Sequence, residues 1–346
     1  CQSFHISIDP KRSILRNSFM MISKSCFVGL ATAAMLLVVV WIFLLDFTFA
    51  FRGRLGEHHH TLTPDLAAQQ PTLPGVYASY AVTEIDLIRA LVIAYNLQQL
   101  GSTHGFVVLT FNMSQSILQT YNTTALRAAL NVEFTAYPLS LDPLFLDPPA
   151  WWKEHSPVRW QKAWVKVATH TLYALYSKIL LVDIDSIMVD TMDELFNLNV
   201  DAITPGIDGR LQSVQLHYTN SGMMFLVPKP STAQKMLQLI NTTSAQDFGG
   251  QIKLGDQEYF TKLFVEKDPD TNRTRVPSIY ISPQYNANPY ACESLSGLVV
   301  KNWHMYQYKP WRASNQHRPG PLSCNKGLLK RWNQLYVEMR RVFAKA

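Results

Sequence analysis

Charge is scarce in this sequence, and basic residues form no long run. Only 16% of the residues are charged, and the net charge of +6 includes a cluster of four cations near the N-terminus, namely Lys11, Arg12, Arg16 and Lys24. No run of five basic residues follows this cluster. Domains that bind nucleic acid usually carry a concentrated basic patch. We therefore expect no nucleic-acid partner.

Cysteine is also rare. Only Cys292 and Cys324 lie in the C-terminal five sixths of the chain, where they could form one disulfide or remain free thiols. The same part of the chain contains four sequons for N-glycosylation, at Asn112, Asn122, Asn241 and Asn272. The sequons favour an oxidising lumen, although they also occur by chance. The sequence has no internal repeat, which favours a single domain in this region.

One long apolar run stands out against this background. Residues 26–45, CFVGLATAAMLLVVVWIFLL, carry no charge, and about 20 such residues suffice for a helix to cross a bilayer. A secretory signal peptide is the competing interpretation, but its apolar region is usually shorter. Because the basic cluster precedes the run, we expect a cytoplasmic N-terminus. The expected segments are a cytoplasmic tail (1–25), a transmembrane signal anchor (26–48), a stem (49–75) and a luminal domain (76–346).

The luminal part alternates short apolar runs with amphipathic stretches of helical length, which is typical of an α/β fold with a mostly parallel sheet. Thr83 is expected to cap the first helix, with Asp86 as its capping-box partner. We interpret the Pro- and Trp-rich segment 138–152 as a surface loop. The expected strands are 76–82, 106–111, 131–137, 178–185 and 222–228, and the expected helices are 161–175, 231–240, 328–342 and one that begins near 255.

Two carboxylates, Asp183 and Asp185, end the most apolar of these strands. Side chains two residues apart in a strand point to the same side, and ligands of open α/β sheets gather beyond the carboxyl ends of the strands. Two oxygen ligands at that place suit a divalent cation that holds phosphates. Alone this pattern is a weak signal, because a turn or a helix cap would use the same residues.

Three later fragments strengthen the interpretation, because they follow ILLVDIDSIMVD (179–190) in a fixed order. They are YTNSGMMFLVPKPS (218–231), GDQEYFTKLF (255–264) and VVKNWHMYQYKPW (299–311). Together the four resemble motifs of glycosyltransferase family 8, the glycogenin-like group that includes plant glucuronosyltransferases of xylan. The resemblance covers about residues 76–311. It implies a GT-A fold, which is a Rossmann-like, mostly parallel sheet.

The resemblance also implies a metal site and a diphosphate site. Asp183, Asp185 and His304 match the family's metal ligands, and the implied ion is Mn²⁺, with Mg²⁺ or Zn²⁺ as alternatives for these ligand types. Lys309 matches the lysine that contacts the donor diphosphate. A solvated surface lysine is the ordinary structural alternative for Lys309.

Residues around the transferred sugar are implied in the same way. Asn220, Ser221 and Asp256 match donor-binding residues, and Gln257 matches the residue near the anomeric carbon, where its weak nucleophilicity fits a front-face displacement. A turn before a strand and a helix N-cap would equally account for Asn220, Ser221 and Asp256. Lys166 matches a donor-binding lysine of the family only with an offset of one residue.

The sequence departs from the family pattern at two further positions. Gln307 replaces a glycine after the metal histidine, so the backbone there is not free to approach the diphosphate as closely. Asp86 aligns with an aromatic residue that packs against uracil in the family. Both differences bear on how the nucleotide is held.

These observations predict a metal-dependent, retaining glycosyltransferase of the Golgi or ER membrane, with its catalytic domain in the lumen. The donor would be a UDP-sugar, either a hexose or glucuronic acid, and the acceptor a glycan, a glycolipid or a protein. A catalytically impaired binding or scaffolding protein on the same fold is the alternative. A two-metal phosphohydrolase is less favoured, because the sequence shows no second cluster of ligands.

Overall fold

A computed structural model describes residues 75–345, except 112, 137–142, 157–161, 209–212, 249–254, 290–294, 296, 306–308 and 312–325. The expected tail, transmembrane anchor and stem lie outside the described residues, as do Gln307, Cys292 and Cys324. Within the described part of the chain, no helix is both long enough and apolar enough to span a bilayer. All described residues belong to one compact unit, Leu62–Ala346.

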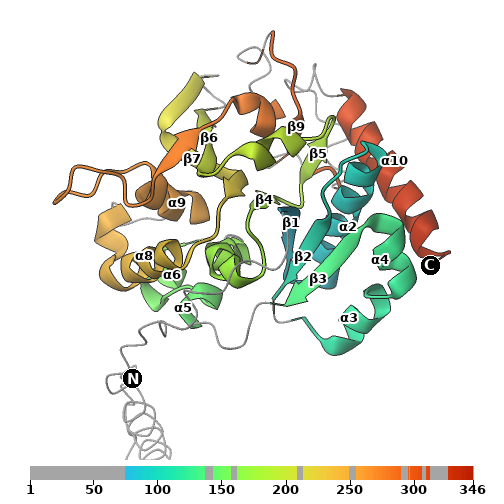
Figure 1. Cartoon of the computed structure of the whole chain (residues 1–346), viewed down its shortest axis with the longest axis horizontal. Helices are drawn as coiled ribbons and strands as arrows, with labels where there is room; N and C mark the ends of the chain where they lie inside the picture. Colours follow the sequence, from blue (N-terminus) through green and yellow to red (C-terminus); the bar gives the residue numbers. More distant parts are fainter. Residues whose placement is uncertain are drawn as a thin grey trace, which may run out of the picture. The chain divides into compact units, whose positions relative to one another are not determined.

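A seven-stranded sheet forms the centre of this unit, in the order β3-β2-β1-β4-β7-β6-β8 (Figure 1). Strands β3, β2, β1 and β4 are mutually parallel, β7 is antiparallel to both β4 and β6, and β8 is parallel to β6. The sheet is therefore mostly parallel, as expected. The strands are β1 Val76–Ala81, β2 Phe106–Thr110, β3 Val132–Ala136, β4 Ile179–Val182, β6 Asp201–Asp208, β7 Ser213–Leu226 and β8 Ser278–Tyr280.

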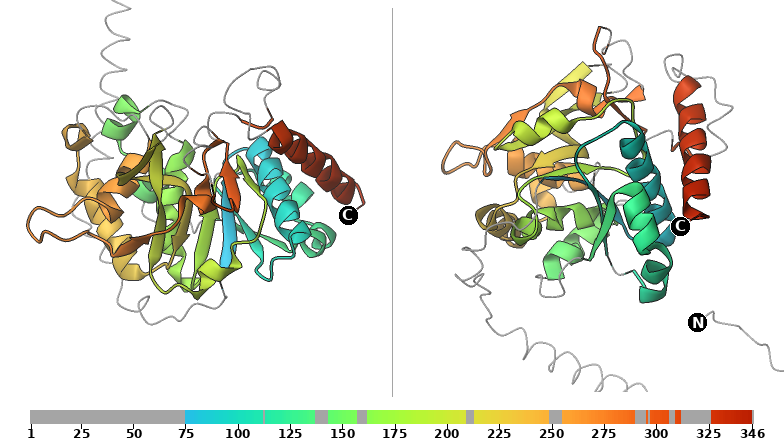
Figure 2. Two further views of the ribbon diagram at one scale, coloured as in Figure 1. Left: turned by 90° about the horizontal axis from the view of Figure 1, so that it is seen from above. Right: turned by 45° about the vertical axis from the view of Figure 1, so that its right-hand side comes forward.

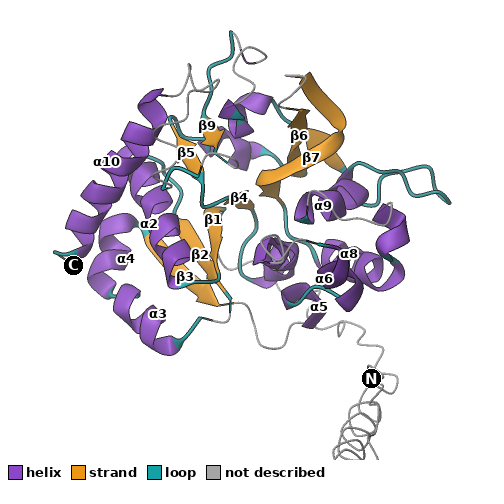
Figure 3. Ribbon diagram, turned by 180° about the vertical axis from the view of Figure 1, so that it is seen from behind, coloured by secondary structure: helices purple, strands orange, loops and turns teal. Residues whose placement is uncertain are grey.

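A second, two-stranded sheet pairs β5 (Ser186–Met188) with β9 (Asn302–His304) in antiparallel fashion. These strands lie side by side in the view from behind (Figure 3). Each is only three residues long, so alternation in the sequence gave no signal for them. Their pairing joins the segment after β4 to a segment near the C-terminus.

Helices cover both faces of the large sheet, and β4 shows the arrangement clearly. Leu180 and Val182 pack into one apolar cluster, whereas Ile179 and Leu181 pack into another. Helices α2, α4 and α10 lie on the first side, and α10 runs beside α2 (Figure 2). The second side is covered by η2, α8 and α9. β4 is therefore buried on both faces, as its continuous apolar sequence predicted.

The helices and 3₁₀ turns follow local sequence signals. Thr83 caps α2, and Asp86 completes the predicted capping box. The described helices are α2 Glu84–Gln99, α3 Gln115–Tyr121, α4 Thr124–Leu130, α5 Pro143–Leu146, α6 Ala150–His155, α8 Pro230–Thr242, α9 Asp256–Phe264 and α10 Lys326–Phe343. The 3₁₀ segments are η2 Lys162–Ala174, η3 Asp193–Asn197, η4 Ala245–Phe248 and η5 Pro283–Asn286.

One structural expectation was wrong. The described part of segment 138–152 contains α5 and α6 instead of a surface loop, and Phe145 and Trp152 are buried. Trp152 packs against Trp164 of η2, with ring centroids 4.7 Å apart. Burial of these aromatic side chains stabilises a segment whose prolines had indicated a loop.

Candidate functional site

The carboxylates of Asp183 and Asp185 meet at the carboxyl end of β4. Pairing with β7 ends at Val182, and a turn follows in which Ser186 N donates to Asp183 O at 3.0 Å. Asp183 N donates to Gly222 O at 2.8 Å, which ties the turn to β7. The two side chains thus converge through this turn, whereas alternation along a strand had been the expected reason.

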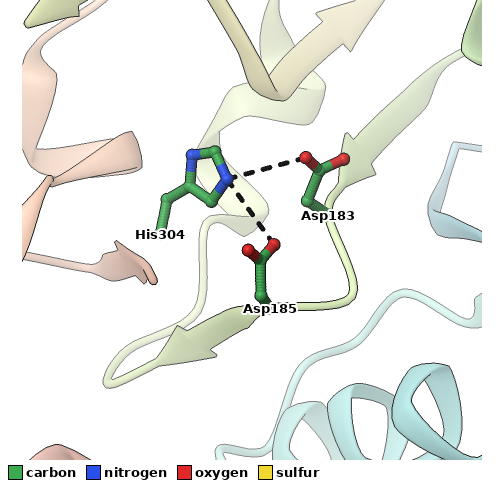
Figure 4. Close-up of side chains that lie close together, drawn as sticks. All are labelled: Asp183, Asp185 and His304. Carbon is green, nitrogen blue, oxygen red and sulfur yellow. Dashed lines mark ion pairs between the residues drawn. The ribbon is translucent and has the colours of Figure 1, made fainter. Parts of the chain in front are cut away.

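His304 reaches the same point from the other end of the chain. It is paired with Ser186 across the β5–β9 sheet, and Met305 N donates to Asp185 O at 2.9 Å. Its Nε2 lies 3.6 Å from Asp183 Oδ2 and 3.5 Å from Asp185 Oδ1 (Figure 4). One ligand atom from each of the three residues falls within 4.8 Å of the others. The small sheet is therefore the element that completes this group.

Gly222 provides the space for the imidazole ring. A Cβ at this position would overlap ring atoms of His304, so no larger side chain fits without movement of the histidine. The side chain of Asn220 fixes this glycine, because its Oδ1 accepts a hydrogen bond from Gly222 N at 3.0 Å. Residues 220–222 (NSG) therefore leave the space that the His304 ring occupies.

Lys166 is buried at the centre of the site, although its sequence match was offset by one residue. Its Nζ lies 2.8 Å from Asp183 Oδ1 and 3.0 Å from Asp256 Oδ2, and its side chain is only 2% exposed. It also donates to Ser221 O at 3.1 Å and to Ser221 Oγ at 3.3 Å. The lysine thereby links η2, the turn after β4, β7 and the start of α9.

The charges at the site change one another's proton affinity. Burial alone would lower the pKa of Lys166, but Asp183 and Asp256 outweigh it and raise that pKa above its usual value. Burial raises the pKa of Asp183, an effect that Lys166 and His304 oppose. Burial would also raise the pKa of Asp185, but Lys309 and His304 hold it well below its usual range. The lowered pKa favours the ionised carboxylate of Asp185, which is the form that binds a cation.

Lys309 forms an ion pair with Asp185 Oδ2. Two residues later, the Trp311 ring lies 3.7 Å below the Arg89 guanidinium carbon and packs against Trp332, with ring centroids 5.9 Å apart. Contacts with α2 and α10 therefore hold the segment that carries Lys309.

Asp86 has a structural role. Its Oδ2 accepts hydrogen bonds from Thr83 N at 3.1 Å and Thr83 Oγ1 at 2.7 Å, and its Oδ1 pairs with Arg89 at 3.3 Å. Both oxygens are thus used within the first turns of α2. Asp86 therefore acts in the N-terminal cap of α2.

The remaining expected residues lie at the start of α9. Asp256 is the first residue of the helix and contacts Lys166, and Gln257 follows it in a half-buried position. The helix begins after Gly255, which has φ of 65° and ψ of −131°, a conformation that favours glycine. This glycine therefore lets the chain turn so that α9 starts beside Lys166.

Tyr80 belongs to the site but was missed in the sequence. Its ring centroid lies 5.5 Å from Lys166 Nζ. Burial and the charges of Asp183 and Asp256 raise the pKa of its phenol well above the usual value. Tyr80 lies near the carboxyl end of β1, the neighbour of β4, where the strand order reverses direction. Sites of α/β sheets form at such switch points, which was the available signal.

Carboxylate oxygens and an imidazole nitrogen at this spacing suit a divalent cation. Mn²⁺ accepts this mixed ligand set, and Mg²⁺ and Zn²⁺ tolerate parts of it. Among the residues that the structure describes, Asp183, Asp185 and His304 form the one group of three that could hold such an ion. The residues present therefore fit a metal site.

Solved structures with this fold include several glycosyltransferases. The galactosyltransferase LgtC, crystallised with donor and acceptor sugar analogs, has a TM-score of 0.53 at 15% identity over 77% of this chain and 96% of that one. GlyE of Streptococcus pneumoniae TIGR4 has a TM-score of 0.50 at 15% identity over 80% of this chain and 63% of that one. The bifunctional WbbM has a TM-score of 0.51 at 11% identity over 80% and 53%.

The chain therefore spans nearly all of LgtC but less than two thirds of GlyE and of WbbM. No known protein family and no curated protein matches the sequence itself. At these low identities the likeness concerns the fold alone. The chain has the α/β fold of these glycosyltransferases, with the Asp183, Asp185 and His304 group at the carboxyl edge of its sheet.

Proposed function

We propose that this chain is a metal-dependent glycosyltransferase that moves a sugar from a UDP-sugar to an acceptor with retention of anomeric configuration. One observation carries the proposal. Asp183, Asp185 and His304, from distant parts of the chain, converge where the resemblance to glycosyltransferase family 8 places metal ligands. The sheet at whose edge they meet is shared with glycosyltransferases.

Asp183, Asp185 and His304 would hold Mn²⁺, with Mg²⁺ as a second candidate. When bound, the ion would neutralise charge on the donor diphosphate and stabilise it as a leaving group. Lys309 adds a positive charge beside Asp185 and would contact the same diphosphate. Lys166 keeps Asp183 and Asp256 in fixed positions, which preorganises the site before the donor binds.

The transferred sugar would lie between β7 and the start of α9. Asp256 would accept hydrogen bonds from sugar hydroxyls, and Asn220 and Ser221 would shape the opposite wall. Gln257 would lie beside the anomeric carbon, where an amide steadies developing positive charge but does not deprotonate an acceptor. In this scheme the departing diphosphate takes the acceptor's proton, and the new bond forms on the face from which the diphosphate leaves.

A neutral hexose is the donor sugar that the described charges favour over glucuronic acid. Lys166, the cation beside Asp256, is already enclosed by two carboxylates and Ser221. A sugar carboxylate next to Asp256 would therefore meet negative charge. A glycan, a glycolipid or a protein would serve as acceptor, and acceptor contacts would come from the 139–160 region, of which 139–142 and 157–160 lie outside the described residues.

The membrane topology proposed from the sequence completes this assignment. The apolar run 26–45 would anchor the protein in the Golgi or ER membrane as a single-pass type II protein with the catalytic domain in the lumen. Protease protection in sealed vesicles tests this topology. Digestion of the sequence after residue 51 from the cytoplasmic side would contradict it.

The decisive experiment is a donor screen with the purified full chain. We expect Mn²⁺-dependent release of UDP from one or a few UDP-sugars, abolished in Asp185→Asn and in His304→Ala. Proton NMR of the first product from an α-linked donor then reports the stereochemistry. A β-linked product would contradict retention, and nucleotide binding without any turnover would instead favour the alternative of an impaired, scaffolding member of the fold.

A further inference from the structure

We infer that Lys309 is an exchangeable cation, whose ammonium group competes with the divalent metal ion for Asp185 and is released toward the donor diphosphate when the ion binds. The inference rests on the proposed function and deepens it, because it adds an order of events at that same site. It also assigns to one residue two opposite effects, one on metal affinity and one on nucleotide affinity.

The contacts of Asp185 are the first reason. One carboxylate oxygen pairs with the Lys309 ammonium, and the other lies 3.5 Å from His304 Nε2. Because Asp185 is a member of the group that fits a metal ion, the ion and Lys309 address the same carboxylate. Two cations on one carboxylate repel each other, and the repulsion is strong where water is largely excluded. His304 and Asp183 would add two further ligands for the divalent ion, and the single charge of Lys309 would then leave Asp185.

The partial exposure of Lys309 is the second reason. Its side chain is 31% exposed, so the ammonium can leave Asp185 without entering an apolar region. The Trp311 ring, over which the ammonium also lies at 5.9 Å, is held by Arg89 and Trp332. Lys166, in contrast, is buried and contacts Asp183, Asp256 and Ser221 together. The site therefore pairs a buried lysine with a partly exposed one.

The balance of charge is the third reason. Three carboxylates, Asp183, Asp185 and Asp256, face two ammonium groups, Lys166 and Lys309. A divalent ion leaves the site with excess positive charge, which a diphosphate offsets. Lys309, once displaced, gains a new partner in that diphosphate, and this links metal binding to donor binding.

The test compares Mn²⁺ affinity of the full chain and its Lys309→Met variant by calorimetry, with no nucleotide present. We expect the variant to bind Mn²⁺ more tightly, by about tenfold, since it lacks the competing charge. Lys309→Arg keeps the charge and should bind Mn²⁺ as the wild type does. The matched control is Lys301→Met, because Lys301 pairs with Glu194 at 2.7 Å and Asp190 at 3.2 Å, carboxylates outside the metal group. This control should leave Mn²⁺ affinity unchanged.

The second measurement is UDP binding to the Mn²⁺-loaded proteins, where Lys309→Met should weaken affinity by about tenfold. Thermal unfolding establishes that each variant is folded. An Mn²⁺ affinity in Lys309→Met equal to or lower than that of the wild type overturns the inference and leaves the proposed function intact. A wild-type chain that binds no Mn²⁺, or binds it equally well as Asp185→Asn, overturns both.

Discussion

The ammonium group of Lys166 lies 3.0 Å from the carboxylate of Asp256, and both side chains are buried. The same ammonium contacts Asp183 at 2.8 Å, so a single cation joins two carboxylates that would otherwise repel each other. Three elements depend on this contact, namely η2, the turn after β4 and the start of α9. The pair therefore has a structural role as well as a proposed one in donor binding.

Lys166→Met is expected to destabilise the fold strongly. Removal of one partner from a buried ion pair leaves uncompensated charge and typically costs about 3–5 kcal/mol. Urea unfolding at neutral pH measures the loss. Lys153→Met is the matched control, since Lys153 pairs with Asp147 on the surface and should cost less than about 1 kcal/mol. Equal losses in the two variants would show that Lys166 does not stabilise the site as its contacts indicate.

Gly222→Ala should impair metal binding specifically. The added Cβ would overlap His304, so the imidazole has to move away from the two carboxylates. We expect Mn²⁺ affinity to fall by about tenfold or more, while the sheet stays folded, because three ligands bind in a geometry that a small displacement disrupts. Gly327→Ala is the control, since nothing lies within 4 Å of a Cβ there. Unchanged Mn²⁺ affinity in Gly222→Ala would remove His304 from the ligand set.

Asp193 should contribute a pH-dependent part of the stability. Burial would raise the pKa of Asp193, but hydrogen bonds from Thr103 N at 2.9 Å and from Tyr77 and Ser102 at 2.8 Å outweigh it and lower that pKa. A pKa lowered in the folded state means that the contribution is complete above the unfolded-state value of about 3.9 and is lost as the pH falls through the folded-state value.

Asp193→Asn is therefore expected to cost about 1 kcal/mol at pH 7. The difference from the wild type should shrink as the pH is lowered below about 4, because protonation removes the same charge from the wild type. Urea unfolding at several pH values measures both proteins. A difference that stays constant over this range would mean that the charge of Asp193 has no part in the stability.

The sequence predicted the elements that long apolar runs define. Strands β1, β2, β3 and β4 were expected to within three residues at each end, because turn signals bound each of them. β1, β2 and β4 are runs of mostly buried residues, whereas in β3 only Val132 is buried. The small β5–β9 sheet was not predictable, since its strands are too short to show a period. It nevertheless positions His304, which only the resemblance to a family had indicated.

The position of Lys166 was also hard to predict, for a physical reason. The segment that carries it, η2, consists of 3₁₀ turns with a kink at Leu172, whose φ is −83° and ψ is 15°. A 3₁₀ helix rises about 2.0 Å per residue, compared with 1.5 Å in an α-helix, and has 3.0 residues per turn. Positions counted along an α-helix therefore do not apply to η2, and the place of Lys166 in the site follows from its contacts with Asp183, Asp256 and Ser221. The places of three further residues in or near the site could not be predicted either, namely Tyr80, Arg89 and Trp311. They follow from contacts between segments that are far apart in the sequence, and local sequence patterns carry no information about such contacts.

Arg89→Met should weaken nucleotide binding through the segment that carries Lys309. The Arg89 guanidinium lies 3.7 Å from the centre of the Trp311 ring, a contact worth about 0.5–2 kcal/mol, and Lys309 lies two residues away. Loss of the contact leaves this segment less ordered, so we expect the Kd of UDP in the presence of Mn²⁺ to rise severalfold. Turnover at saturating donor should change less, because the bound nucleotide restores the order of the segment that carries Lys309.

Arg127→Met is the control, since Arg127 of α4 pairs with Glu133 of β3 at 3.7 Å, outside the metal group. Isothermal calorimetry and steady-state kinetics separate the two effects. If Arg89→Met binds UDP as tightly as Arg127→Met, Arg89 serves only the α2 cap through Asp86, and Lys309 is positioned by other contacts.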